Sequence, residues 1–398
     1  MLVIALAVCL IAAIYLLASH FTYAVGFPLD DSWIHQTYAR NLAINGEWAF
    51  RPGIPSAGST APLWSALLSV GFFLNLSPYI WTYLLGAITL FALAILCEWA
   101  VRRLVVSYRP RLPWVGGFIA LEWHLVWAGM SGMETLLHAL IVTTVLILLM
   151  TGSPRYLLLG LLTGLSVWVR PDGLTLLGPA LMTMVLTEGD IRSRTSAVFR
   201  YLIGFGVLFG FYLLFNLAVG GTPMPNTFYA KQAEYVEWQA LPALTRLGQM
   251  LLQLLVGPSL FLAPGVIGWL VKSVRDRSSR LPAYQHGRYI MPAMPVFFLF
   301  GLLAFAEFDK SKLFARYHWI GQLVWRASIV MLTFAFIVLG ANSYARDVAV
   351  IESEMVVTAR WVAENLPPDA VIAAHDIGAL GYFDDHDLID LAGLVSPE

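Results

Sequence analysis

The stretch Phe27-Pro28-Leu29-Asp30-Asp31-Ser32-Trp33-Ile34-His35 follows an apolar N-terminal run, Leu2 to Ala18, that carries no charge. A run of this length and composition predicts a helix that crosses a membrane. Asp30 and Asp31 come about ten residues later, so we expect them in or just beyond the lipid headgroups. Adjacent carboxylates there keep their charge and can still face a substrate that the membrane carries.

The composition is that of a membrane protein. Of 398 residues, 59% are hydrophobic and only 12% are charged, and the mean hydropathy is +0.72. Apolar stretches of membrane-spanning length recur along most of the sequence. The net charge of -1 argues against a nucleic-acid partner. Cys9 and Cys97 both fall inside apolar stretches, which excludes a disulfide framework.

These stretches predict an all-α polytopic membrane protein, a helical bundle with a long first outer loop over residues 20–77. Within that loop, residues 60–76 contain too few apolar residues to span a bilayer and predict an interfacial helix. The bundle helices are expected near 2–19, 78–101, 113–131, 133–151, 155–169, 171–187, 199–219, 243–271, 284–306 and 321–341.

The arginines orient the bundle. Arg102 and Arg103, with further arginines before residue 112 and again over 192–200, mark two cytoplasmic loops. Counting helices from these loops places Asp30 and Asp31 outside, together with the short loops at Glu134 and Arg170 and the segment 220–246. We therefore expect a protein of a bacterial-type cytoplasmic (inner) membrane with its active site on the outer face.

The alternation of loops between the two sides of the membrane fails further along the chain. Basic residues at 272–280 and at 310–316 place both segments in the cytoplasm, yet only one crossing is predicted between them. Three explanations stay open. The first basic run faces outward, or the segment 243–271 is a re-entrant pair, or a helix is missing from this region.

Asp30 and Asp31 stand at the start of an amphipathic pattern that continues through Trp33, Ile34 and Tyr38. An aspartate at a helix start caps the free backbone N–H groups and gains from the helix dipole. One cap needs one carboxylate, which leaves the second to do chemistry or to bind a cation.

Several blocks follow the acidic pair in a fixed order. They are Gly58-Ser-Thr-Ala-Pro-Leu-Trp64, Gly132-Met-Glu-Thr135, Arg170-Pro-Asp-Gly173, Pro225-Asn-Thr-Phe-Tyr-Ala-Lys231 and His286-Gly-Arg-Tyr289. With the N-terminal helix and the acidic loop, this set resembles the GT-C membrane glycosyltransferases. That superfamily includes protein O-mannosyltransferases, the lipid A aminoarabinose transferase and the arabinofuranosyltransferases, and the motifs are most similar to the arabinofuranosyltransferase-like branch.

The resemblance implies transfer of a sugar from a polyprenyl-phosphate donor to an acceptor hydroxyl, with inversion. It assigns the acceptor base to Asp30, with Asp31 as its neighbour or as a second candidate. A carboxylate can take the proton that the attacking hydroxyl loses. The departing lipid phosphate needs cations, and the resemblance assigns Arg170, with Lys231 and Arg288 as further candidates. For Arg170, an internal ion pair with Asp172 is the alternative.

The same resemblance points to residues that contact the sugar or the acceptor: His35, Arg40, Glu134, Asp172, Asn226, Tyr229, His286 and Tyr289. The acceptor is a glycan, a lipid or a protein. The resemblance implies no firm cofactor. Dependence on a divalent cation, Mg²⁺ or Mn²⁺, stays open, and Glu134 with an acidic residue of the first outer loop would be its ligands.

After residue 341 the composition becomes that of a soluble segment, so we expect a membrane domain over 1–341 and an incomplete α/β segment over 342–398. Residues 345–365 predict an amphipathic helix, and strands are expected at 370–374 and near 388–391. The acidic cluster Asp384, Asp385 and Asp387 is either a Ca²⁺ site or a solvated turn.

Besides the glycosyltransferase, two other interpretations fit the same composition. A transporter or flippase for a lipid-linked or polar substrate would line its path with buried charges, although no internal repeat is visible. An inactive GT-C-like scaffold is the third alternative.

Overall fold

The structure is a computed structural model that describes residues 1–105, 108, 110–151, 155–187, 189–234, 240–242, 245–246, 291–308 and 318–395. Apart from residues 245–246, the helix expected at 243–271 lies outside the described residues. The first part of the helix expected at 284–306 and the open question of topology there lie outside them as well. So do the predicted site residues His286, Arg288 and Tyr289.

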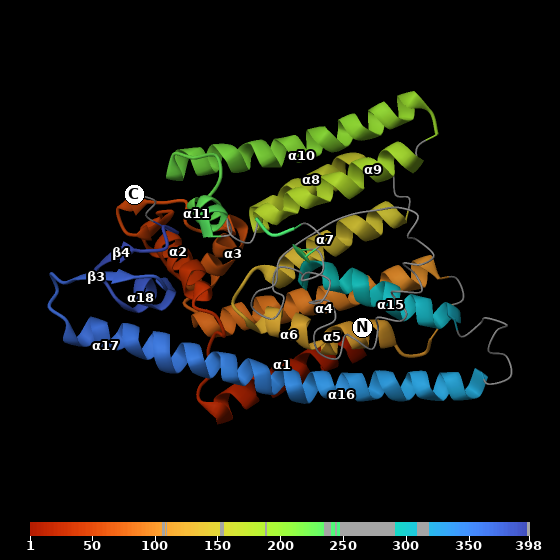
Figure 1. Ribbon diagram of the computed structural model, residues 1–398, viewed down its shortest axis with the longest axis horizontal. Helices are drawn as coiled ribbons and strands as arrows, with labels where there is room; N and C mark the ends of the chain where they lie inside the picture. Colours follow the sequence, from red (N-terminus) through yellow and green to blue (C-terminus); the bar gives the residue numbers. More distant parts are fainter. Residues whose placement is uncertain are drawn as a thin grey trace.

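The predicted all-α polytopic bundle is confirmed (Figure 1). Four helices of the described chain are long and apolar enough to cross a membrane: Leu2–Thr22, Pro78–Leu104, Ile191–Gly220 and Arg326–Asn365. The bundle comprises α1 (Leu2–Thr22), α4 (Pro78–Leu104), α5 (Trp114–Leu121), α6 (Trp123–Met130), α7 (Thr135–Met150), α8 (Tyr156–Val169), η1 (Pro171–Leu176), α9 (Leu177–Thr187), α10 (Ile191–Gly220), η3 (Met291–Ala293), α15 (Met294–Phe308) and α16 (His318–Val350).

The single helix expected over 113–131 was wrong, because the chain breaks at Glu122 into α5 and α6. Glu122 has an extended backbone conformation, and its buried carboxylate accepts a hydrogen bond from the backbone N–H of Leu125. The side chain thus caps the first free N–H groups of α6. A second oxygen of the same carboxylate lies 2.7 Å from Nδ1 of His124.

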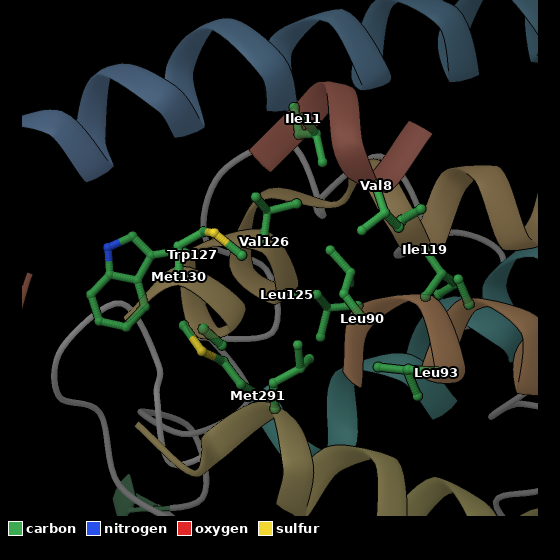
Figure 2. Packing of buried hydrophobic residues seen from close by; sticks show 14 of the residues in the cluster. Val8, Ile11, Leu90, Leu93, Ile119, Leu125, Val126, Trp127, Met130 and Met291 are labelled. Atoms are coloured by element: carbon green, nitrogen blue, oxygen red, sulfur yellow. The ribbon is translucent and has the colours of Figure 1, made fainter. Parts of the chain in front are cut away.

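The apolar core lies within the bundle, where the largest cluster of buried side chains joins α1, α4, α5, α6, α15 and α16. Figure 2 shows this packing, with Val8 and Ile11 of α1, Leu90 and Leu93 of α4, Ile119 of α5 and Leu125 of α6 among the labelled residues. A second cluster joins α7, η1, α8, α9 and α10. The two clusters contain residues of α7 and α8, and the polar residues Glu134 and Arg170 lie at the ends of these two helices.

The helices α8 and α10 pack against each other through glycines. A Cβ atom on Gly160 of α8 would overlap the carbonyl oxygen of Tyr201, and one on Gly204 of α10 would overlap that of Leu157. Small residues at such crossings let two membrane helices approach closely. This contact sets where α8 ends, and Arg170 follows directly on that end.

The polar segment between α1 and α4, residues 23–77, is called the polar cap below. It contains α2 (Asp31–Asn45), a hairpin of β1 (Ala49–Arg51) and β2 (Ile54–Pro55), and α3 (Pro62–Phe73). The Asn41 side chain of α2 donates hydrogen bonds to the carbonyls of Ala49 and Phe50 and so ties the hairpin to the helix. The helix predicted within 60–76 is confirmed as α3.

At the other end of the sequence, α16 continues through a π-helical turn, η5 (Ile351–Val356), into α17 (Val357–Asn365). The expected start of the soluble segment, residue 342, lies inside α16. Beyond α17, the predicted strands are present as β3 (Val371–Ala374) and β4 (Asp387–Asp390), which pair in parallel across α18 (Gly378–Phe383). Residues 371–395 are called the C-terminal unit below.

The π-helical turn joins the C-terminal helix to the chain between α1 and α2. Its Glu352 accepts a hydrogen bond from the Tyr79 hydroxyl of α4, and it packs so closely on Gly26 that a side chain there would overlap it. Figure 1 shows α2, α3, α11 (Asn226–Glu234) and the C-terminal unit gathered at one end of the long helices.

Replacing Gly160 should loosen the α8 and α10 contact. We expect Gly160→Ala to lower the free energy of unfolding by about 1–3 kcal/mol, as overpacking does. The matched control is Gly206→Ala on the exposed side of α10, where a Cβ meets no atom within 4 Å. Thermal unfolding in detergent measures both, and equal melting temperatures for the two variants would contradict the packing.

Candidate active site

One pocket lies between the polar cap, α11 and the C-terminal unit. Its walls come from segments that are far apart in the sequence: Asp31, Ile34, His35, Gly58, Thr60, Met133, Thr227, Lys231 and Leu394. Three of the sequence-predicted site residues, Asp31, His35 and Lys231, therefore meet in one place. The pocket holds a carboxylate, an imidazole and an ammonium group beside apolar side chains.

The two adjacent aspartates have different environments. Asp31 lines the pocket, whereas the carboxylate of Asp30 accepts hydrogen bonds from the backbone N–H groups of Gly378 and Ala379, at 2.6 and 2.8 Å. Asp30 thus caps the first turn of α18 and makes no cap bond to its own helix α2. The expected capping role is real, but the capped helix belongs to the C-terminal unit.

Burial raises the pKa of Asp30 from 3.8 to about 6, while the two N–H groups lower it and the nearby Asp31 and Asp376 carboxylates add to the increase. At neutral pH the carboxylate is therefore ionised. In that form both of its oxygens accept from the α18 backbone.

His35 of α2 is buried and held on both ring nitrogens. Its Nδ1 lies 3.0 Å from the Ser65 hydroxyl and 3.3 Å from that of Ser59. Its Nε2 lies 3.3 Å from Oε2 of Glu134. The ring therefore joins the polar cap to the loop between α6 and α7.

Glu134 stands at the centre of a buried charged network. Its other oxygen, Oε1, accepts a hydrogen bond from Nη1 of Arg170 at 2.5 Å, and the Glu134 side chain is fully buried. Arg170 also contacts Oδ2 of Asp172 at 3.0 Å through Nε and Nη2. The ion pair of Arg170 with Asp172, which the sequence left as an alternative, is present, and Glu134 extends it toward His35.

The motif around Glu134 is shaped by a close approach of backbones. Gly132 has a positive φ of 82°, and a Cβ there would lie 2.8 Å from the Ser32 Cβ. The Ser32 hydroxyl donates to the carbonyl of Ser131 at 2.6 Å, and the Trp64 indole donates to that of Gly132 at 2.9 Å. These bonds fasten the Glu134 loop to α2 and α3, which only glycine allows at this distance.

The predicted site residues of α11 differ in position, and only one of them lines the pocket. Lys231 lines the pocket. Asn226 is buried, and its backbone N–H donates to the carbonyl of Ala57 at 3.0 Å, which docks the start of α11 on the polar cap. The Tyr229 side chain is 41% exposed and is not among the pocket residues.

Arg40, predicted as a sugar or acceptor contact, lies outside this pocket. Its guanidinium donates to the carbonyl of Tyr382 at 2.6 Å and covers the ring of the same residue. Arg51 of the hairpin pairs with Asp387 at 2.8 Å. The two arginines and Asp30 together attach the C-terminal unit to the polar cap.

The acidic cluster of the C-terminal unit is part of the same attachment. Asp387 binds Arg51, and Asp384 lies 2.6 Å from Nδ1 of His386. Among the residues that the structure describes, no group of three or more His, Cys, Asp and Glu side chains is arranged to hold a metal ion. Dependence on Mg²⁺ or Mn²⁺ stays a prediction.

Six residues of the pocket were not predicted as site residues: Ile34, Gly58, Thr60, Met133, Thr227 and Leu394. The first five lie inside the sequence blocks Phe27–His35, Gly58–Trp64, Gly132–Thr135 and Pro225–Lys231, so these motifs contain most of the pocket wall. No sequence motif pointed to Leu394, because its position depends on how the C-terminal unit packs.

The fold is similar to that of solved membrane proteins. The crystal structure of ArnT from Cupriavidus metallidurans bound to undecaprenyl phosphate matches with a TM-score of 0.61 and 15% identity, over 98% of this chain and 86% of that chain. The apo form of the same protein matches with a TM-score of 0.62, at the same identity and coverage. The resemblance to GT-C membrane glycosyltransferases is confirmed at the level of the fold.

Two comparisons of the sequence itself add little to this structural similarity. A search of the curated proteins finds no match for this chain. A family model described as a domain of unknown function, DUF8728, matches residues 343–398. That range covers the last part of α16 and the whole C-terminal unit.

Removing Glu134 should leave the buried Arg170 charge without its main partner. We expect Glu134→Ala to lower the free energy of unfolding by about 3–5 kcal/mol, as breaking a buried pair from one side does. Asp172→Ala is the control, because the Asp172 side chain is 46% exposed and water can replace it. Chemical or thermal denaturation in detergent compares the two, and an equal loss in both variants would contradict the central place of Glu134.

Proposed function

We propose that this chain transfers a sugar from a polyprenyl-phosphate donor to an acceptor hydroxyl at the outer face of the cytoplasmic membrane. The observation that carries the proposal is the pocket in which Asp31, His35 and Lys231 meet. A carboxylate can act there as general base, and an ammonium group can bind the phosphate that leaves.

Asp31 is the acceptor base in this proposal. The acceptor oxygen attacks the anomeric carbon from the face opposite the phosphate, and its proton passes to the Asp31 carboxylate. The bond between the anomeric carbon and the phosphate oxygen breaks, and polyprenyl phosphate departs with that electron pair. The configuration at the anomeric carbon inverts.

The assignment of the base moves from Asp30 to Asp31 for a geometric reason. Asp30 uses both carboxylate oxygens to hold the α18 backbone, and a base must reach the hydroxyl that it deprotonates. Asp31 stands on the pocket wall, one turn before Ile34 and His35.

Lys231 is the proposed contact of the donor phosphate. It lies one turn after Thr227 on α11, and both residues line the pocket. Arg170 is proposed as a positioning residue, because its guanidinium is buried and shared between Glu134 and Asp172. Through Glu134 it holds His35 against the pocket.

Arginines at the far ends of the helices support the outer placement. Arg102 and Arg103 lie in the last turn of α4, whose first turn packs on Phe27 beside the site. Arg192 and Arg194 lie at the start of α10, whose end at Gly220 approaches Ala57 of the polar cap. Basic ends on the side away from the pocket agree with a cytoplasmic location of those ends.

The comparison supports the donor class. A protein of the same fold, ArnT from Cupriavidus metallidurans, was crystallised bound to undecaprenyl phosphate. The acceptor, a glycan, a lipid or a protein hydroxyl, is proposed by class alone, with the bilayer as the compartment that delivers the donor.

Substitution of Asp31 tests its proposed role as the acceptor base. We expect Asp31→Asn to lower the turnover number at least about 100-fold, the usual contribution of a general base. Its affinity for undecaprenyl phosphate and its amide exchange at residues 378–379 should stay as in the wild type. The assay supplies radiolabelled polyprenyl-phosphate sugars with membrane extract as acceptor.

The matched control is Asp30→Asn. Its amide group cannot accept from both backbone donors, so exchange at Gly378 and Ala379 should accelerate. Loss of turnover in Asp30→Asn with unchanged exchange, beside an active Asp31→Asn, would return the base role to Asp30. Product from no donor, in folded wild-type protein, would favour the transporter or the inactive scaffold.

Substitution of Lys231 tests its proposed contact with the donor phosphate. A charge-assisted hydrogen bond contributes about 1.5–3 kcal/mol, so Lys231→Ala should weaken undecaprenyl phosphate binding about ten-fold or more. Lys231→Arg should retain most of the affinity, and Arg200→Ala, which removes an exposed charge of α10, should retain all of it. Equal affinity in Lys231→Ala and the wild type would exclude this contact.

A further inference from the structure

The C-terminal unit is attached to the polar cap at three points. Asp30 holds the first turn of α18, Arg40 holds the carbonyl of Tyr382, and Arg51 holds Asp387. The attachment uses hydrogen-bonded charges on two successive elements, α2 and the hairpin. The loop that follows β4 is thereby brought to the mouth of the pocket.

That loop, residues 391–395, is held in shape by Asp390. The Asp390 side chain is 8% exposed, and its two oxygens accept from the backbone N–H groups of Ala392 and Val395, at 3.0 and 2.7 Å. Gly393 between them has a positive φ of 68°. Such a loop has a defined conformation rather than a choice of several.

The loop packs directly on the polar cap. Leu394 and Val395 join a buried cluster with Ile34 and Tyr38 of α2. A Cβ on Gly58 would lie 2.5 Å from Val395 Cγ1 and 2.9 Å from the carbonyl oxygen of Leu394. The glycine therefore lets the loop approach the cap closely enough for Leu394 to reach the pocket.

The pocket is lined by Thr227 and Lys231 of α11 and by Asp31 and Ile34 of α2. Leu394 packs in the same cluster as Ile34, which lies one turn after Asp31. Leu394 thus lines the pocket next to α2, the helix that carries the proposed base.

We infer that Leu394 is a specificity-determining residue for the acceptor. The loop 391–395 supplies an apolar wall beside Asp31, against which the group that bears the accepting hydroxyl lies during transfer. The wall limits the size of that group and excludes water from the anomeric carbon. This inference rests on the proposed function, because it assigns one side of the same pocket to the acceptor. In parallel sheets, loops at the carboxyl ends of strands commonly form ligand sites, and this loop follows β4.

Water provides the acceptor of smallest size, so hydrolysis of the donor measures how well the wall excludes it. In hydrolysis, water attacks the anomeric carbon, the same bond to phosphate breaks and the proton again passes to Asp31. The experiment uses the full chain and the undecaprenyl-phosphate sugar that supports wild-type turnover. It compares free sugar released with sugar transferred to membrane extract.

Leu394→Ala should raise the ratio of hydrolysis to transfer about ten-fold, the usual effect of a few methylenes in a pocket. Leu394→Trp should reduce transfer by at least the same factor while hydrolysis continues. In both variants the affinity for undecaprenyl phosphate should equal that of the wild type. Leu391→Ala and Leu391→Trp are the controls, because Leu391 belongs to the same loop and its side chain is 64% exposed.

An unchanged ratio in both Leu394 variants, with wild-type turnover present, would overturn the assignment of Leu394 alone. The same shift in the Leu391 variants would overturn it as well, because the effect would then belong to the loop as a whole. Absence of any transfer or hydrolysis by folded wild-type protein would overturn the proposed function and the inference with it.

Discussion

The geometry of the site depends on the contacts that the buried carboxylate of Glu134 makes with Arg170 and His35. One of its oxygens accepts from Arg170, and the other lies 3.3 Å from Nε2 of His35. These contacts connect the loop before α7, the end of α8 and the helix α2. A charge removed from water must be compensated by partners at fixed positions, so the three segments cannot shift independently. His35 lines the pocket, so these contacts also hold one wall of the pocket in place.

The pair of aspartates shows how one short motif can serve two purposes. Successive residues at the start of a helix point about 100° apart, because a turn contains about 3.6 residues. Asp30 and Asp31 therefore point in different directions. Asp30 is directed to the backbone of α18, and Asp31 to the pocket. The first carboxylate attaches the C-terminal unit, and the second lines the pocket beside it. The attachment point and the pocket residue are thus neighbours in the chain, which explains how a remote loop can form a wall of the pocket.

Much of the bundle could be predicted from the sequence, because long apolar runs such as Leu2–Thr22 and Pro78–Leu104 have few alternatives in a membrane. The motifs also contained residues that the fold brings together, since Glu134 pairs with Arg170 and His35 lines the pocket with Lys231. The break at Glu122 was missed, since a buried carboxylate that caps its own chain looks like one polar residue in a long apolar run. The partner of Asp30 lies 348 residues away, and no local pattern carries such a contact. Which aspartate faces the pocket, and that Arg40 turns away from it, depend on that same long-range packing.

The proposed function requires that the pocket between α2, α11 and the loop 391–395 receive the phosphate of a polyprenyl carrier. A cryo-electron microscopy structure of the full chain with undecaprenyl phosphate would locate that phosphate. We expect phosphate density in this pocket, with a phosphate oxygen at about 2.7–2.9 Å from Nζ of Lys231, as in charge-assisted hydrogen bonds. A phosphate bound elsewhere on the bundle, with no density beside Lys231 and Asp31, would contradict the proposed function.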